Sequence, residues 1–134
     1  MLMIKSYKDL NVWQKAMELA DRIYEATENF PKREWYGLAN QLRRAAVSIA
    51  SNIAEGSTRG SKEFIHFIAI ARGSVAEVET QILISAKRKY ISAVAQTELE
   101  KIADDISRMA MGLSRAITQS SSNKAQGTKH KALT

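Results

Sequence analysis

Residues 61–84 read SKEFIHFIAIARGSVAEVETQILI, and this stretch decides the fold. Its apolar residues recur at alternating steps of four and three, the spacing of a helix that packs along one stripe against partner helices. The stripe comprises Phe64, Ile68, Ala71, Val75, Val78 and Ile82. The spacing therefore predicts a long helix that opens after Ser61, a favourable N-cap residue.

Three other segments have the same helical spacing, at about residues 10–29, 34–55 and 96–118. Phe30-Pro31 ends the first, Gly56 is expected as the left-handed C-cap of the second, and a turn around residues 90–95 precedes the last. The stripes are Leu10, Trp13, Met17, Ala20, Tyr24 and Thr27, widened by Ala16, Leu19 and Ile23; Leu38, Leu42, Ala45, Ile49 and Ile53; and Leu99, Ile102, Ile106, Met109, Leu113 and Ile117. We expect an all-α, antiparallel, up-down-up-down four-helix bundle.

Composition agrees with one helical domain. The 134 residues include one proline, six glycines and no cysteine, which disfavours an all-β fold and excludes disulfides and thiolate metal sites. The first residues show no signal-peptide pattern. The longest uncharged stretch, 45–54, is shorter than the roughly 20 residues that span a bilayer. We therefore expect no membrane association and a cytoplasmic protein. We predict a bundle over residues 1–118 and a basic, polar, disordered tail over 119–134.

The formal net charge of +6 favours a polyanionic partner, although the predicted tail alone contributes +3 through Lys124, Lys129 and Lys131. Arg59 and Lys62 flank the expected start of the third helix, where free backbone N–H groups can hold a phosphate. The plainer interpretation is a capped loop in which both side chains are solvated. The candidate nucleic-acid-binding residues are Arg43, Arg59, Lys62, Lys87, Arg88 and Lys89.

A polar stripe lies beside the apolar stripe of the second predicted helix and comprises Gln41, Arg44, Ser48, Asn52 and Glu55. The third has a matching stripe of Ser74, Glu77 and Gln81, so we expect hydrogen bonds between helices or between subunits, with Arg44 pairing a carboxylate such as Glu77. The same helix carries Phe67, Ile70 and Ile84 away from its seam. Because a lone bundle leaves such residues in water, we assign both sets to an oligomer interface or polar network.

Catalytic chemistry finds little support in the sequence. Glu63 and His66 have a Glu-x-x-His spacing, but a di-iron bundle needs a second copy and two more glutamates. No nucleophile and base accompany the serines, so we expect no catalytic residue, no metal site, no cofactor and no enzyme activity. Among the aromatic residues, Trp13 and Tyr24 are expected to be packed, whereas Trp35 and Tyr36 are candidates for stacking on bases.

Several motifs resemble those of the 23S ribosomal RNA intervening-sequence protein family, also called four-helix bundle proteins, over about residues 7–117. The matching segments are Leu10-Asn11-Val12-Trp13-Gln14-Lys15-Ala16, Phe30-Pro31, Tyr36-Gly37-Leu38, residues 41–49, Asn52-Ile53-Ala54-Glu55-Gly56 and Ala71-Arg72-Gly73-Ser74 followed by Glu77. Lys89 is a departure, because the family commonly has glycine there.

The resemblance implies a left-handed bundle that assembles as a ring-like homopentamer. The family is named for genes inside insertions in ribosomal RNA genes, and it is similar to the accessory protein of diversity-generating retroelements, a basic pentamer that binds nucleic acid and a reverse transcriptase. Our first hypothesis is a non-catalytic homo-oligomer that binds RNA or DNA through basic surface. The alternative is a protein-interaction scaffold or accessory subunit for a reverse transcriptase or another protein partner.

Overall fold

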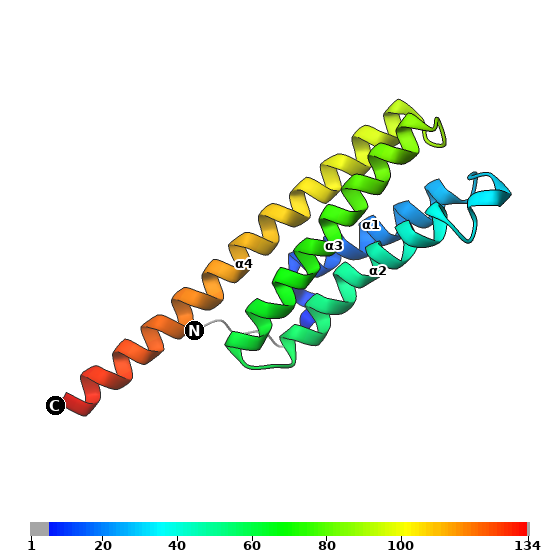
Figure 1. Cartoon of the computed structure of the whole chain (residues 1–134). Coiled ribbons are helices and arrows are strands. Elements are labelled where there is room, and N and C mark those ends of the chain that lie inside the picture. Colours follow the sequence, from blue (N-terminus) through cyan, green and yellow to red (C-terminus); the bar gives the residue numbers. More distant parts are fainter. Residues whose placement is uncertain (1–5, 134) are drawn as a thin grey trace.

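The computed structural model describes residues 6–133, with side chains described for residues 6–123. Its elements are the short 3₁₀ helices η1 (Tyr7–Asp9) and η2 (Lys32–Glu34) and the helices α1 (Asn11–Thr27), α2 (Leu38–Ser57), α3 (Ser61–Lys87) and α4 (Ala93–Leu133). Each long helix contacts its neighbours in the chain, and α4 returns to contact α1 (Figure 1). The predicted all-α, up-down-up-down four-helix bundle is confirmed. None of the described helices is apolar over enough of its length to cross a bilayer.

The core follows the predicted stripes of α2 and α3. Every residue of the α3 stripe is buried, and so is the α2 stripe except Leu38, which is half-buried. The two helices pack against each other along their length, and α1 and α4 close the bundle from the other side (Figure 1). The helical spacing of apolar residues thus located the buried faces of α2 and α3 correctly.

The predicted centre of the α1 stripe is wrong. Met17 and Tyr24 are 46% and 45% exposed, whereas the buried face of α1 is Val12, Ala16, Leu19, Ile23 and Thr27. The stripe predicted for α1 lies at the edge of this helix, where Trp13 and Ala20 are only partly buried. In α4, Met109 is likewise 37% exposed, whereas Ala103 and Ala110 are buried.

Two predicted helix ends are also corrected. Gly56 lies inside α2 and is buried, and a Cβ atom there would stand 2.6 Å from the Cβ of Phe67. This glycine therefore permits close approach of α2 and α3 and is not a C-cap residue. The residue that caps α3 is Gly60, which supplies no side-chain hydrogen bond, and Ser61 is already the first helical residue.

The turn between α3 and α4 contains a left-handed residue at Lys89, whose φ is 62°. Its backbone N–H donates to the carbonyl of Ala86 at 3.0 Å, and that of Tyr90 donates to the carbonyl of Ser85 at 2.9 Å. These bonds close the end of α3 as in a Schellman motif. The turn thus needs the conformation that glycine adopts most easily, although the chain has lysine there.

Helix α4 continues past Ile117 to Leu133 and projects beyond the other helices (Figure 1). The boundary at residue 118 and a disordered tail over 119–134 stay predictions. Lys124, Lys129 and Lys131 lie outside the residues whose side chains are described.

Candidate nucleic-acid interface

One end of the bundle brings together the end of α1, the start of α2 and the turn between α3 and α4 (Figure 1). Aromatic contacts join the two connections: the rings of Phe30 and Tyr90 are 5.3 Å apart, and the Arg33 guanidinium lies 6.0 Å from the centroid of the Tyr90 ring. Residues that are distant in sequence therefore share one surface.

Six cations gather at this end, and we call them the cationic end: Lys32, Arg33, Arg43, Lys87, Arg88 and Lys89. None of them forms an ion pair with a described residue. All except Arg43 are exposed. The connection between α1 and α2 contains two acidic residues, Glu28 and Glu34, and the turn between α3 and α4 contains none. Because unpaired, exposed cations are free to contact phosphate, this end suits a polyanion.

The structure separates the predicted cation set. Arg43, Lys87, Arg88 and Lys89 lie at the cationic end, whereas Arg59 and Lys62 lie at the opposite end of α3, whose 27 residues span about 40 Å. Arg59 pairs with Glu55 at 3.2 Å and with Glu63 at 3.6 Å, which reduces its availability to a phosphate. At the candidate phosphate site at the start of α3, Glu55 and Glu63 thus already hold the Arg59 side chain.

A hollow of about 480 Å³ lies beside the cationic end, and we call it the Trp35 hollow. It is lined by Thr27, Glu28, Trp35, Tyr36, Ala39, Asn40 and Arg43. Trp35 and Tyr36 are 49% and 93% exposed. The sequence singled out Trp35, Tyr36 and Arg43, but it gave no signal for Thr27 and Asn40, whose place depends on how α1 meets α2.

Arg43 is held in place by α1. Its Nε donates to Thr27 Oγ1 at 2.8 Å, and its guanidinium carbon lies 4.7 Å from the centroid of the Tyr24 ring. The expectation that Tyr24 is packed in the core is wrong, because this ring instead supports Arg43 from the surface. Trp13 is partly buried against the core and stacks edge-on with Tyr7 at 5.3 Å, in agreement with its expected packing.

The polar stripes of α2 and α3 line a groove of about 420 Å³. Ser48 Oγ and Ser74 Oγ are 3.0 Å apart, Asn52 Nδ2 donates to the backbone oxygen of Ser48 at 2.8 Å, and Gln81 Nε2 donates to Gln41 Oε1 at 3.4 Å. The Ser48–Ser74 and Gln41–Gln81 contacts join α2 to α3, whereas the Asn52–Ser48 bond lies within α2. Whether the set also joins subunits stays a prediction.

Arg44 and Glu77 line this same groove but form no ion pair within the described chain. The predicted pairing of Arg44 with Glu77 is therefore not made within the described chain. Glu55, another member of the predicted set, turns to Arg59 instead. Arg44 and Glu77 keep unpaired charges on an exposed surface.

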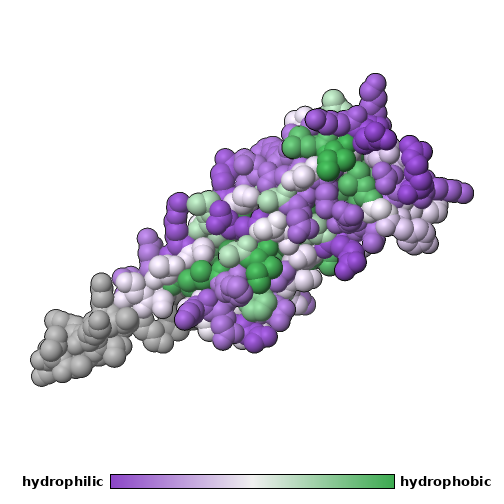
Figure 2. Space-filling model, in the orientation of Figure 1, coloured by the Kyte–Doolittle hydropathy of each residue, from purple (hydrophilic) through white to green (hydrophobic). Residues whose placement is uncertain are grey.

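Apolar side chains outside the core are found where the sequence predicts them on α3. Phe67 is half-buried, and Ile70 and Ile84 are 41% and 44% exposed. Leu83 of the same helix is also exposed. Figure 2 shows apolar side chains reaching the visible surface in separate patches toward the two ends of the bundle.

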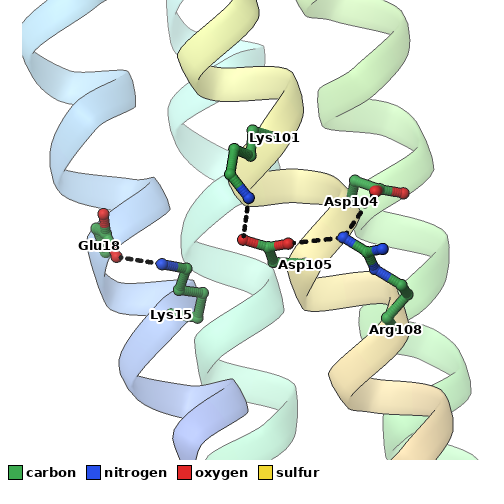
Figure 3. Close-up of polar contacts among 6 residues, drawn as sticks. All are labelled: Lys15, Glu18, Lys101, Asp104, Asp105 and Arg108. Carbon is green, nitrogen blue, oxygen red and sulfur yellow. Dashed lines mark hydrogen bonds and ion pairs between the residues drawn. The ribbon is translucent and has the colours of Figure 1, made fainter.

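Several charged side chains of α1 and α4 form ion pairs, and six of these side chains are drawn in Figure 3. Lys15 pairs with Glu18 at 3.2 Å, and Arg108 pairs with Asp104 at 3.1 Å and Asp105 at 2.8 Å. The hydrogen bond from Arg108 lowers the pKa of Asp105 below its usual value, with a smaller contribution from Lys101. Lys15, Lys101 and Arg108 are thus neutralised locally and are less available to a polyanion than the cations of the cationic end.

The Glu-x-x-His pair does not form part of a metal-ligand cluster. Glu63 pairs with Arg59, and the His66 ring contacts the Phe67 ring edge-on at 6.1 Å. Among the described residues no three side chains of the metal-binding types lie together.

Comparison with known proteins places this geometry in a family. The model of the family described as 23S rRNA-intervening sequence protein matches residues 8–112. A crystal structure from Bacteroides thetaiotaomicron VPI-5482, described as a protein with unknown function from the S23 ribosomal protein family, is similar with a TM-score of 0.69. The two chains are 22% identical over 77% of this chain and 97% of that one, a likeness of fold alone. No curated protein matches the chain.

Proposed function

Because the chain belongs to the 23S rRNA-intervening sequence protein family, we propose that it is a non-catalytic, homo-oligomeric protein that associates with RNA or DNA through the cationic end. The observation that carries this proposal is the set of unpaired cations at Lys87, Arg88 and Lys89, exposed together at the turn between α3 and α4. Lys32, Arg33 and Arg43 extend the set across the neighbouring connection.

Phosphate contacts give nucleic-acid binding a characteristic dependence on salt. Each phosphate that a cation neutralises releases counterions, so the logarithm of the binding constant falls by about 0.9 per contact for each unit of log salt on a duplex. Two cations removed from the contact surface should therefore reduce this slope by about two. Cations that lie elsewhere should leave it unchanged.

The chain offers a matched pair of variants for this test. Lys87→Gln with Arg88→Gln removes one lysine and one arginine from the cationic end, and Arg59→Gln with Lys62→Gln removes the same charges from the opposite end. Lys89 is left intact because its backbone shapes the turn. Filter binding to a structured RNA over a salt series should show the larger loss of affinity and slope for the first variant.

Two results would contradict the proposal. The first is the absence of detectable binding by the parent protein even at low salt. The second is an equal loss for both double variants, which would indicate that only net charge matters.

The homo-oligomeric part of the proposal is supported by the exposed Ile70 and Ile84 and by the unpaired Arg44 and Glu77 on the groove between α2 and α3. A neighbouring subunit would cover the first pair and could neutralise the second. We propose a closed ring, a pentamer by resemblance to the family. Light scattering should give a multiple of the 14.9 kDa chain mass, and a monomeric mass at micromolar concentration would count against it.

The variants Ile70→Glu and Ile84→Glu test whether these two side chains lie at an interface between subunits or in the core of the monomer. If the side chains lie between subunits, each variant should give soluble, helical monomer, because a buried charge opposes association but not folding of the chain. Lost helicity in circular dichroism would place these residues in the monomer core. An unchanged mass would place them on open surface.

The second candidate function is a scaffold for a protein partner, such as a reverse transcriptase. The observation that favours it is the exposure of three apolar side chains of α3, Ile70, Leu83 and Ile84. It gains support if the parent is monomeric and a pull-down after nuclease treatment recovers a protein that Ile84→Glu fails to recover.

A further inference from the structure

The Trp35 hollow has the dimensions and composition of a small-ligand site. Its volume of about 480 Å³ is within the range of ligand pockets, and it combines two aromatic rings with a few polar side chains. Tyr36 is 93% exposed, which leaves a large ring in water at the edge of the hollow. Such a ring gains contact area when a planar group stacks on it.

The Trp35 ring is held by its edge. Its Nε1 donates to the backbone oxygen of Phe30 at 3.2 Å, and Lys32 Nζ lies 5.8 Å from the ring centroid. The hydrogen bond orients the indole through its edge, and Lys32 lies over one ring face, so a base has to stack on the other face. A planar ligand on this ring also has a cation beside it.

Arg43 supplies an oriented anion-binding group at the other side of the hollow. Thr27 Oγ1, which accepts from Arg43 Nε, itself donates to the backbone oxygen of Ile23 at 2.7 Å, so the anchor is fixed in turn. The two terminal nitrogens of Arg43 have no hydrogen-bond partner among the described side chains. They are free for a phosphate, which arginine can bind with two parallel hydrogen bonds.

Asn40 and Glu28 complete the lining. Asn40 is exposed and offers both a donor and an acceptor, the combination that pairs with the edge of a base. Glu28 repels phosphate but accepts from an exocyclic amino group. These preferences place the phosphate at Arg43 and the base between the aromatic rings and the polar edge.

A second hollow of about 430 Å³ continues from the first along α2 and shares Asn40 and Arg43 with it. It is lined further by Tyr24, Arg44, Val47 and Ser48. A chain that places one base in the Trp35 hollow can therefore continue past Arg43 toward a second arginine. This arrangement favours a strand over a free nucleotide.

We propose that the Trp35 hollow holds one unpaired base of a single-stranded nucleic acid, stacked on Trp35 and Tyr36 with its phosphate on Arg43. The inference rests on the proposed function and adds a site for single strands to the charge-based binding of the cationic end. A duplex cannot use this site, because its bases are already stacked and paired.

The chain allows a direct optical test. It contains two tryptophans, so Trp13→Phe leaves Trp35 as the only one. In this background a single-stranded RNA of about ten nucleotides should quench Trp35 fluorescence. An abasic strand of the same length and inorganic phosphate should not, because they carry the phosphate without the base. Equal quenching by the abasic strand would overturn the proposal.

Affinity variants test the stacking separately. Tyr36→Ala should weaken single-strand binding about 5- to 100-fold and leave duplex binding within about twofold, whereas Tyr36→Phe, which keeps the ring, should bind like the parent. Because Tyr36 is exposed, circular dichroism should show that both variants remain folded. Equal affinities of Tyr36→Ala and Tyr36→Phe for the single strand would refute the stacking role.

The outcomes distinguish this inference from the proposed function. If the duplex binds and Lys87→Gln with Arg88→Gln weakens it, but Tyr36→Ala and the quenching show nothing, the hollow is not a base site and the proposed function stands. If no nucleic acid binds at all, both fail. If Tyr36→Ala instead changes the mass measured by light scattering, the hollow is a contact between protein chains and the base site is wrong.

Discussion

Replacing Gly56 with alanine tests how closely α2 and α3 approach each other. Gly56 is buried inside α2, and a Cβ atom there would lie 2.6 Å from the Cβ of Phe67 and 3.0 Å from Cδ1 of Phe64. Ordinary carbon contacts are about 3.5–4.0 Å. The Cβ of Phe67 moves only with its backbone, so α2 and α3 must separate locally by about 1 Å to admit the new methyl group.

Two opposing free-energy terms decide the result. Alanine is favoured over glycine inside a helix by about 0.5–1 kcal/mol. Overpacking a close contact costs about 1–3 kcal/mol. The balance predicts that Gly56→Ala lowers the free energy of unfolding by about 1 kcal/mol.

Gly73 provides the matched control. It lies within α3, and a Cβ atom there would meet no atom within 4 Å. Gly73→Ala gains the same helix propensity without the overlap, so it should raise the free energy of unfolding by about 0.5–1 kcal/mol. The same chemical change should thus have opposite signs at the two positions.

Urea unfolding followed by circular dichroism, at one protein concentration for all three proteins, measures the difference. Fixing the concentration is necessary because association would stabilise the folded chain by mass action. Parallel slopes with separated midpoints would allow direct comparison. If Gly56→Ala were as stable as Gly73→Ala, the close approach of α2 and α3 at Phe67 would be refuted.

Three other substitutions test local features of the bundle. Lys89→Gly should raise the free energy of unfolding by about 0.5–1 kcal/mol in urea melts, because φ is 62° there, whereas Lys89→Ala should give no gain. Asp105→Asn should lower the free energy of unfolding at neutral pH but not in strong acid, as urea midpoints at both pH values would show. The hydrogen bond from Arg108 lowers the pKa of Asp105 in the folded protein. The stabilisation by the Asp105 carboxylate is therefore present above the usual pKa of 3.8 and is lost as the pH falls through the lowered pKa. Val75→Asp should abolish cooperative thermal unfolding near the parent's temperature, because it places a charge at a fully buried site at a cost of several kcal/mol.

The sequence predicted the seam of α3 well because its four-three spacing holds over the whole helix, although other apolar residues lie off the seam. In α1 two offset sets of apolar residues have the same helical spacing, one through Val12 and Ala16 and one through Trp13 and Met17, and spacing alone does not tell which set is buried. Met17 and Tyr24 therefore fit a helical stripe although they are exposed. The burial of α1 depends on where α2 and α4 sit, which only the assembled bundle fixes.

The candidate site was predictable only in part. Cations and exposed aromatics can be found by residue type, and Arg43, Trp35 and Tyr36 were found in this way. Their position in one site could not be predicted, because it depends on the packing of α1 and α2, which brings Thr27 to Arg43. Arg59 shows the converse: its ion pairs with acidic neighbours follow from the path of the loop before α3.

The link between α2 and α3 has a consequence for the order of folding. Helix α2 ends at Ser57 and α3 begins at Ser61, so these helices meet after closure of a very short loop, at low entropic cost. Contacts between α1 and α4 instead require almost the whole chain to be arranged. We therefore expect the hairpin of α2 and α3 to form first, so that changes at Gly56 alter the folding rate. Changes to the ion pair of Arg22 on α1 with Glu98 on α4 would then act mainly on the unfolding rate.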